Sequence, residues 1–508
     1  MGKVWLVGAG PWDAGLLTLK GKEVLSRAQV VVYDRLVGPG ILSMIPENAE
    51  CIDVGKQAGN HTMPQEEINQ VLLREALADR RVVRLKGGDP FLFGRGGEEL
   101  ELLSRHGIPF EIVPGVPSAI SVPAYNGIPV THRDQVSSLH IITGHKKKGE
   151  PYDLDFDALV RTKGTLVFLM GSAALPEICK GLLNAGMDPD MPAALLQQGT
   201  MAGQKKLLST VSLLASEAAK STVATPAIIL VGKVCSYGEA FGWYEKLPLF
   251  GKRILVTRPR ERSGTLAGRL RELGGEVLEA PAISTVLTPD KEDLLRELER
   301  LGEYDWMAFT SPAGVNLFFD ELREQKKDIR SIGRAKIAAI GPGTAKELEK
   351  RGLNVDAMPN IYDGQELGKL LGQVLQDKER LLIPRARKGN PQLIQEIRKQ
   401  KEVEIVDLPI YDTVYGVLEH QGAVDVKAWC EKGDKVMAVF TSASTVRGFA
   451  ACTQGMDYRL VQALCIGKQT RAQAEKLGME TFTSKEATID SLVELAVEVS
   501  ACSRKDGS

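Results

Sequence analysis

The stretch best suited to binding chemistry is VVRLKGGDPFLFGRGGEE, residues 82–99. Its apolar run ends in Gly87, Gly88 and Asp89, and a second glycine cluster surrounds Arg95. Paired glycines let a backbone approach a ligand closely, and Asp89 can accept hydrogen bonds where the strand ends. One isolated glycine pair is typical of a tight strand–helix turn, whereas two clusters with Asp and Arg between them favour a binding loop. We therefore expect the main ligand here.

Another glycine-rich turn, GAGPWD, follows the apolar run at residues 3–7. A dinucleotide-binding fingerprint would need glycine where this chain has Asp13, and Pro11 removes a backbone N–H from such a phosphate cradle. The pattern therefore disfavours a nicotinamide site, although Asp34 stands near the place of the ribose-binding acid. Asp34 follows the apolar run at residues 30–33, so its carboxylate either faces the expected cleft or caps a turn.

These turns need sheets to position them. Short apolar runs alternate with amphipathic helical patterns along the whole chain, which predicts an α/β protein. In an open α/β sheet, ligands lie beyond the carboxyl ends of the strands, where both glycine-rich turns are expected. A length of 508 residues is too great for one ordinary domain and predicts about three or four.

The composition argues against several classes of protein. Hydrophobic residues make up 43% of the chain and charged residues 25%, as in soluble globular proteins. The net charge of −1 provides no overall basic field for nucleic acid. Seven cysteines are dispersed without a C-x-x-C pair, which suits reduced thiols and a cytoplasmic location. We expect no metal centre, signal peptide or membrane span.

The second half contains an internal repeat. The blocks RILVTRP, APAIST, FTSPAGV and AIGPGTAKELEKRG recur in the same order, about 130 residues later, as RLLIPRA, LPIYDT, FTSASTV and CIGKQTRAQAEKLG. Apolar strands followed by Ser, Thr or Gly and then a helix predict two similar α/β lobes. Strand-end hydroxyls and helix N-termini would face a common cleft that suits an anionic ligand.

The first half resembles a known family. Its motifs VGAGP, YDRLV, VVRLKGGDPFLFGRGGEE, VPGVPSA, AYNGIPVTHR, TGH, FLMG, QQGT and TPAIILVG resemble those of tetrapyrrole methylases, and uroporphyrinogen-III C-methyltransferases in particular. The resemblance implies a domain at 1–246 with α/β lobes at about 1–114 and 115–246. It implies that S-adenosylmethionine binds between them and leaves as S-adenosylhomocysteine. The implied cofactor contacts are Pro11, Gly87, Gly88, Asp89, Leu92, Pro117, Ser118, Met170, Gly199 and Ala227.

The same resemblance implies roles in methyl transfer, with Asp34 as proton acceptor and Lys56 as proton donor. Transfer from a sulfonium is an in-line displacement that needs mainly positioning, and a carboxylate can stabilise positive charge left on an electron-rich ring. The implied substrate, a cyclic tetrapyrrole, carries carboxylates that basic side chains can bind. The candidates are Arg35, Lys56, His61, Lys86, Arg95, His132 and Arg133.

Two positions depart from the family pattern. The first loop of the family usually reads GAGPGD, so Trp12 replaces a glycine beside the cofactor and is expected to narrow its entry. Pro117 stands where the family usually has threonine, which removes one side-chain hydrogen bond. Two alternatives stay open for this half: methylation of a later corrin intermediate, and a cofactor-binding regulatory module with weak catalysis.

The repeat-containing half resembles uroporphyrinogen-III synthase over residues 252–502, through TRP, FTSPAGV, IGPGTA, IPRA, PIYDT, FTSAST and IGKQT. The resemblance implies two flavodoxin-like lobes, at about 252–283 plus 414–502 and at about 286–408, joined by strands near 280–287 and 406–415. Residues 247–251 would form a linker, and residues 503–508 a frayed tail.

Tyr411 matches the candidate of that family for assisting the departure of a hydroxyl group, and a half-buried strand tyrosine is the alternative. Further carboxylate contacts are expected from basic and hydroxyl side chains at strand ends, where helix capping is the alternative for the hydroxyls. These candidates are Arg258, Ser311, Arg385, Ser442, Ser444 and Thr470.

Together the two resemblances imply a bifunctional enzyme of tetrapyrrole biosynthesis. The second half would cyclise hydroxymethylbilane to uroporphyrinogen III with inversion of the last pyrrole. The first half would methylate that product twice to precorrin-2, a precursor of siroheme and cobalamin. The expected partners are small-molecule tetrapyrroles and a second copy of the chain, as a homodimer through the methyltransferase half, without nucleic acid or membrane.

Overall fold

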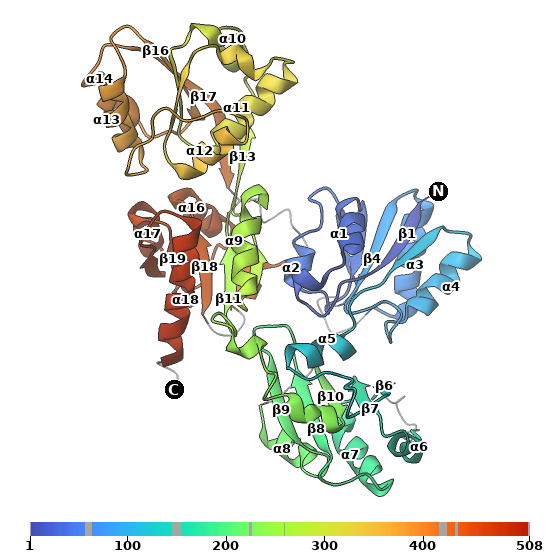
Figure 1. Cartoon of the computed structure of the whole chain (residues 1–508). Helices are drawn as coiled ribbons and strands as arrows, with labels where there is room; N and C mark the ends of the chain where they lie inside the picture. The colour runs from blue at the N-terminus through green and yellow to red at the C-terminus, as the bar shows by residue number, and fades with distance from the viewer. Residues whose placement is uncertain are drawn as a thin grey trace. The chain divides into compact units, whose positions relative to one another are not determined.

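The computed structural model describes residues 2–55, 63–144, 154–222, 226–258, 260–415, 424–431 and 435–505, without the side chains of 260–265 and 504–505. The predicted α/β class is confirmed, since the strands of these residues form four five-stranded sheets between helices (Figure 1). The chain divides into two compact units. The first contains Met1–Pro281, Leu418–Val446 and Cys452–Ser508, and the second contains Ala282–Val417 and Arg447–Ala451.

The first sheet is parallel throughout and has the order β3-β2-β4-β1-β5. Its strand β2 is a continuous, fully buried apolar run because helices cover a parallel sheet on both faces. The strand order reverses between β1 and β4, so the loops after these strands open at the place where α/β sheets bind ligands. The elements are β1 Lys3–Gly8, α1 Leu19–Ser26, β2 Val30–Tyr33, α2 Pro39–Leu42, β3 Glu50–Asp53, α3 Gln65–Leu77, β4 Arg81–Lys86, α4 Gly96–Arg105 and β5 Phe110–Val113.

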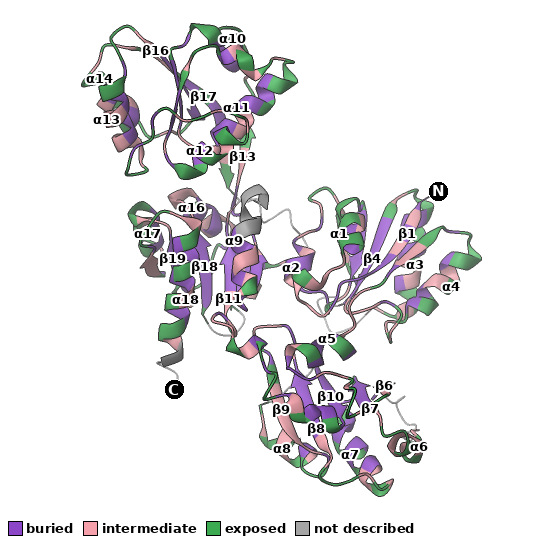
Figure 2. Ribbon diagram, in the orientation of Figure 1, coloured by how far each residue is buried: buried purple, intermediate pink, exposed green. Residues whose placement is uncertain are grey.

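The second sheet has the order β6-β7-β10-β8-β9 and is mixed, because β10 runs antiparallel to both of its neighbours. Fully buried strands again form its centre, drawn in purple in Figure 2. The elements are α5 Ser118–Tyr125, β6 Leu139–Thr143, α6 Phe156–Arg161, β7 Thr165–Leu169, α7 Leu175–Asn184, β8 Pro192–Gln197, β9 Lys205–Thr210, α8 Leu214–Lys220 and β10 Ala227–Val231.

The third sheet, β12-β11-β18-β19-β20, belongs to the first compact unit. The segment predicted as a linker is anchored to it, because Leu249 is fully buried in its core and the Ser500 hydroxyl donates to the Pro248 carbonyl at 2.9 Å. The last helix continues to Lys505, so residues 503–505 of the expected frayed tail are helical. The elements are β11 Arg253–Val256, α9 Arg260–Glu272, β12 Glu276–Glu279, α15 Val426–Glu431, β18 Val436–Phe440, α16 Ala443–Cys452, β19 Val461–Cys465, α17 Lys468–Glu475, β20 Glu480–Thr483 and α18 Ile489–Lys505.

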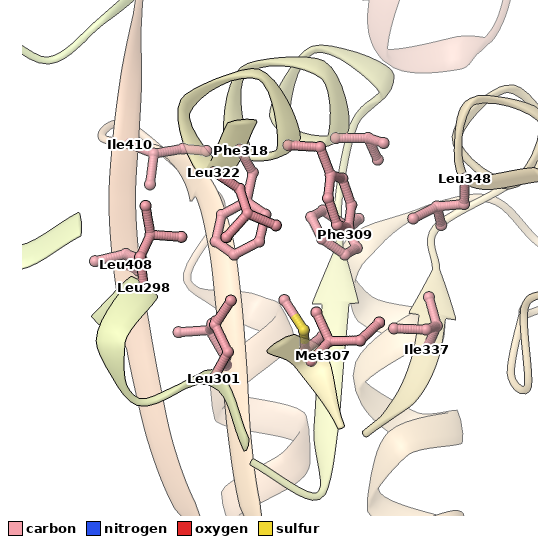
Figure 3. Packing of buried hydrophobic residues seen from close by; sticks show 14 of the residues in the cluster. Leu298, Leu301, Met307, Phe309, Phe318, Leu322, Ile337, Leu348, Leu408 and Ile410 are labelled. Atoms are coloured by element: carbon pink, nitrogen blue, oxygen red, sulfur yellow. The ribbon is translucent and has the colours of Figure 1, made fainter. Parts of the chain in front are cut away.

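The fourth sheet, β13-β17-β16-β14-β15, forms the second compact unit. Its core contains Phe309 and Phe318, whose rings meet edge to face with centroids 5.8 Å apart (Figure 3). The elements are β13 Ile283–Leu287, α10 Glu292–Glu299, β14 Trp306–Phe309, α11 Pro312–Glu324, β15 Lys336–Ala339, α12 Pro342–Glu349, α13 Gly364–Val374, β16 Arg380–Ala386, α14 Gln392–Arg398 and β17 Glu404–Tyr415.

The sequence repeat is interleaved between these two sheets. The third sheet joins β11 and β12 of the first copy to β18 and β19 of the second, and the fourth joins β14 and β15 of the first copy to β16 and β17 of the second. Repeat-equivalent strands occupy equivalent places, since β11-β18-β19 in one sheet corresponds to β16-β14-β15 in the other. The two crossing strands pair antiparallel as β13 and β17, close to the predicted positions.

Candidate active sites

The loops after β1, β4 and β5 form the first candidate site, which we call the glycine cradle (residues 8–11, 87–89 and 115). The Gly10 N–H donates to the Gly88 carbonyl at 3.1 Å, and the Gly88 N–H donates back to the Gly10 carbonyl at 2.8 Å. Gly88 has φ +69°, and a Cβ added at Gly115 would overlap the backbone of Gly8 and Gly88. The three strand ends can meet this closely only because they lack side chains there.

Asp89 ties the cradle together. Its Oδ1 accepts from the backbone N–H groups of Phe91 and Leu92 at 2.8 and 3.1 Å, and its Oδ2 accepts from Gly115 N–H at 3.0 Å. The carboxylate therefore fixes the loop after β4 against the loop after β5, and it sets the backbone position of Leu92. In this structure both Asp89 oxygens bind backbone amides, which gives the residue a positioning role in the cradle.

A network of charged side chains adjoins the cradle at the end of β4. Arg84 Nη2 lies 3.5 Å from Asp34 Oδ2, and its Nε lies 3.1 Å from Glu99 Oε1. Lys86 Nζ lies 2.7 Å from the same Glu99 oxygen, and Glu99 is fully buried. Burial, together with the nearby Arg84 charge, lowers the pKa of Lys86 below its ordinary value. Sequence reasoning missed Arg84 and Glu99, although two cations alternating along an otherwise apolar strand indicate that one face of β4 carries charge.

The candidate carboxylate-binding residues of the first half have different surroundings. Lys86 is buried against Glu99, so its charge is compensated inside the protein. Arg95 is exposed and pairs with Glu98 at 2.6 Å, which raises the pKa of the guanidinium. Arg35 and Arg133 are exposed, and the His132 ring stacks on Tyr237 with centroids 4.9 Å apart. Lys56 and His61 lie outside the described residues.

The remaining proposed cofactor residues lie on the two lobes of the first half. Pro117 and Ser118 open α5, and Met170 follows β7 with φ +57° and a side chain 56% exposed. Gly199 lies against Val122 so closely that a Cβ would meet that side chain at 2.5 Å, and Ala227 begins β10 as a buried residue. The Thr200 hydroxyl donates to the Pro11 carbonyl, which links the second lobe to the glycine cradle.

A second candidate site lies in the other compact unit, where Tyr411 on β17 meets Ser311 before α11. The two hydroxyl oxygens are 2.7 Å apart, and Ser311 Oγ also accepts from Gly314 N–H at 2.9 Å as a helix cap. Tyr411 is only 6% exposed, so its phenol is held in one place by the core and by Ser311. The capping and site roles considered for Ser311 are thus compatible.

The other candidates of the second half are anchored to varying degrees. Arg385 is buried and makes a bidentate pair with Asp407, with two contacts of 2.6 Å, so its charge is compensated inside the fold. The hydroxyl of Ser442, just before α16, and that of Ser444, in its first turn, hydrogen-bond each other at 2.8 Å. Thr470 is buried in the first turn of α17, and Arg258 follows β11 half-exposed. The structure therefore brings Tyr411 together with Ser311 and brings Ser442 together with Ser444.

Comparison with known proteins identifies both halves. Residues 3–215 match the model of the tetrapyrrole (corrin/porphyrin) methylases, and residues 264–494 match that of uroporphyrinogen-III synthase HemD. The porphyrin biosynthesis protein HemD of Ruminiclostridium josui is 45% identical over 498 residues, 98% of either chain. This chain belongs to that family, a tetrapyrrole methylase fused to a uroporphyrinogen-III synthase.

Two further relatives match parts of the fusion. A uroporphyrinogen-III C-methyltransferase of Bacillus subtilis is 42% identical over 359 residues, which cover 70% of this chain and 73% of that protein. A siroheme synthase of Enterobacter sp. is 52% identical over 243 residues, 48% of this chain and 52% of that protein. Within the described ranges of the fusion, no helix is long and apolar enough to cross a membrane, and no three His, Cys, Asp or Glu side chains form a metal-binding group.

Proposed function

We propose that the synthase half closes hydroxymethylbilane to uroporphyrinogen III, and that the methylase half adds two methyl groups from S-adenosylmethionine to give precorrin-2. The observation that carries the proposal is the presence of both family matches in one chain, each over a built site. The glycine cradle supports the methyl transfer, and the Tyr411–Ser311 pair supports the cyclisation. The product of one half is the substrate of the other.

The glycine cradle fits the proposed cofactor, because its loops present backbone rather than side chains at the ends of β1, β4 and β5. The exposed Met170 side chain, at a positive φ, provides a flexible apolar wall on the other lobe. When bound, S-adenosylmethionine supplies a methyl group made electrophilic by the sulfonium. Asp89 holds the loops after β4 and β5 together, and Thr200 holds the loop that contains Pro11. These contacts provide the positioning that an in-line displacement needs.

Asp34 is the proposed proton acceptor of the methylase half. Its side chain is 24% exposed and lies beside Arg84, which is itself held by the buried Glu99. Arg84 therefore orients one carboxylate oxygen, the other accepts from the Leu36 N–H at 3.0 Å in a turn, and part of the side chain stays open to solvent. There it can stabilise positive charge on a pyrrole carbon that has accepted a methyl group, and can take the proton that this carbon releases. Arg35, Arg95 and Arg133 are exposed and can bind carboxylates of the substrate, with Lys56 proposed as proton donor.

Tyr411 is the proposed acid of the synthase half. Its O–H can donate a proton to the hydroxyl group of the open-chain substrate, which then leaves as water. Ser311 fixes the phenol in one orientation, because its own oxygen is held at the N-terminus of α11. Ring closure with inversion of the last pyrrole then depends chiefly on how the protein folds the substrate, since the uncatalysed product is the uninverted isomer.

The test uses the full chain with hydroxymethylbilane, with and without S-adenosylmethionine. We expect the type-III isomer of uroporphyrinogen without the cofactor, and a product heavier by two methyl groups with it, followed by absorbance and mass. Formation of only the uninverted isomer would contradict the synthase assignment. Correct cyclisation without a gain of methyl mass would contradict the methylase assignment and favour a regulatory first half.

A further inference from the structure

The first loop of the glycine cradle is held residue by residue. Gly10 pairs with the loop after β4, and the Pro11 carbonyl accepts from the Thr200 hydroxyl. The Asp13 carboxylate accepts from Tyr125 O–H at 2.8 Å. These three restraints come from the methylase half itself. Of residues 10–13, only Trp12 donates a side-chain hydrogen bond to the synthase half.

Trp12 is restrained by the synthase half. Its indole Nε1–H donates to Glu276 Oε1 at 3.0 Å, and the other oxygen of that carboxylate accepts from Ala202 N–H at 2.8 Å. Glu276 therefore joins two methylase loops, the one that contains Pro11 and the one that follows Thr200. All of these residues belong to the first compact unit.

Glu276 is well placed to act as a fixed support. It is the first residue of β12, the edge strand of the third sheet, and its N–H donates to the Lys252 carbonyl at 2.9 Å. The backbone that carries the carboxylate thus follows the synthase sheet and not the methylase loops. A support of this kind can order a loop without taking part in its chemistry.

The backbone at Trp12 shows why the loop needs such a support. Its φ of +95° lies in the region that favours glycine, and a tryptophan there persists only where surrounding contacts hold it. One neighbour is Gly38, where a Cβ would meet the Trp12 carbonyl oxygen at 2.5 Å. The hydrogen bond to Glu276 is the polar contact that fixes the indole. Without it, relaxation at residue 12 would move the adjacent Pro11.

We propose that Glu276, in the synthase half, is a positioning residue of the methylase half that orders the cofactor loops through Trp12 and Ala202. This inference rests on the proposed function, because it takes Pro11 to be part of the cofactor site. On this account the synthase half supports methyl transfer mechanically, in addition to supplying its substrate. Trp12, where the family pattern has glycine, is then an adaptation to the fusion.

The test compares Glu276→Gln with the wild type in the full chain. The amide nitrogen cannot accept a hydrogen bond, so at least one of the two loop contacts is lost. We expect the KM for S-adenosylmethionine and the Kd for S-adenosylhomocysteine to rise about tenfold, the effect of one charge-assisted hydrogen bond, with kcat little changed. The synthase rate of the same sample should stay at the wild-type value.

Two further variants make the result specific. Glu279→Gln lies on the same strand and removes a pair of 2.9 Å with Arg271 inside the synthase half, so both constants should stay unchanged. Trp12→Phe replaces the indole with a smaller phenyl ring and removes the N–H donor, so it should also raise the Kd, and the two losses should combine to less than their sum in the double variant. The Trp12 indole N–H resonance should shift in Glu276→Gln.

The outcomes separate the two ideas. A wild-type protein that neither binds S-adenosylhomocysteine nor transfers methyl groups would refute the proposed function itself. Normal wild-type methylation with an unchanged KM and Kd in Glu276→Gln would overturn only the positioning role. Full additivity of the Trp12 and Glu276 effects would also overturn it, because residues that act through one contact must be coupled.

Discussion

The substitution Glu99→Gln tests the network of charged side chains, Arg84, Lys86 and Glu99, that adjoins the glycine cradle. Glu99 is fully buried, and its Oε1 accepts from Lys86 at 2.7 Å, from Arg84 at 3.1 Å and from Gln65 at 3.2 Å. Among the described residues its Oε2 has no hydrogen-bond partner, so the amide group of glutamine can stand there without displacing a donor. The substitution therefore removes one negative charge while it preserves the shape of the side chain.

The expected loss in the free energy of unfolding follows from the two buried cations that remain without Glu99. Arg84 and Lys86 are 3% and 6% exposed and would share a buried site without their common counter-ion. Removing one partner of a buried ion pair costs about 3–5 kcal/mol. Because the amide oxygen still accepts hydrogen bonds, we expect the lower end, a loss of about 3 kcal/mol in the free energy of unfolding at pH 7. Glu98→Gln is the matched control, since Glu98 is exposed, and should leave the unfolding midpoint unchanged.

Urea unfolding over a range of pH gives the decisive measurement. The pKa of Lys86 is lower in the folded state than its ordinary value of 10.5, so the unfolded state binds more protons and stability rises with pH up to that value. Loss of the Glu99 charge lowers the Lys86 pKa further. The deficit of Glu99→Gln should therefore be largest near neutral pH and shrink as the pH approaches 10.5. A deficit independent of pH, or no recovery when Lys86→Met is added, would refute this reasoning.

Three other perturbations test the remaining contacts. Gly115→Ala should abolish measurable calorimetric binding of S-adenosylhomocysteine, because a Cβ there overlaps the facing loops, whereas Gly97→Ala, with open space around its Cβ, should bind normally. Tyr411→Phe should lower formation of the type-III isomer by about 10²-fold, the usual contribution of a general acid, and an unchanged isomer ratio and rate would exclude Tyr411 as the acid. Arg385→Ala should cost the second compact unit about 1 kcal/mol in urea unfolding, because the bidentate pair is lost while the 43% exposed Asp407 carboxylate is solvated by water, whereas Arg387→Ala, at an exposed arginine, should unfold at the wild-type midpoint.

The sequence predicted the elements and their motifs well where burial is uniform. The apolar run at residues 30–33 forms the fully buried strand Val30–Tyr33, and the run at residues 3–7 forms most of the strand Lys3–Gly8. Strands buried on both faces are continuous apolar runs, and that signal is local. The ends of helices were harder to predict than their existence. The last helix, for example, continues to Lys505, beyond the expected start of a frayed tail.

The partners of charged residues could not be predicted in this way. Lys86 and Arg385 were both expected to bind substrate carboxylates, and the structure pairs each with a carboxylate of the same chain, the buried Glu99 and the exposed Asp407. A lone cation in a strand has the same local pattern whether its counter-ion is a ligand or another part of the chain. The contact between Trp12 and Glu276 likewise joins residues 264 positions apart, which no local pattern reports.

By itself the sequence determined the two families, the α/β class, the glycine-rich turns and the repeat, because each is written in residue types at short spacing. The tertiary structure alone decided that the repeat is interleaved between two sheets, that Asp89 binds three backbone amides, and that Glu276 supports a loop of the other half. The physical reason is that hydrogen bonds and ion pairs act over a few ångströms in space, and only the folded chain brings distant residues within that range.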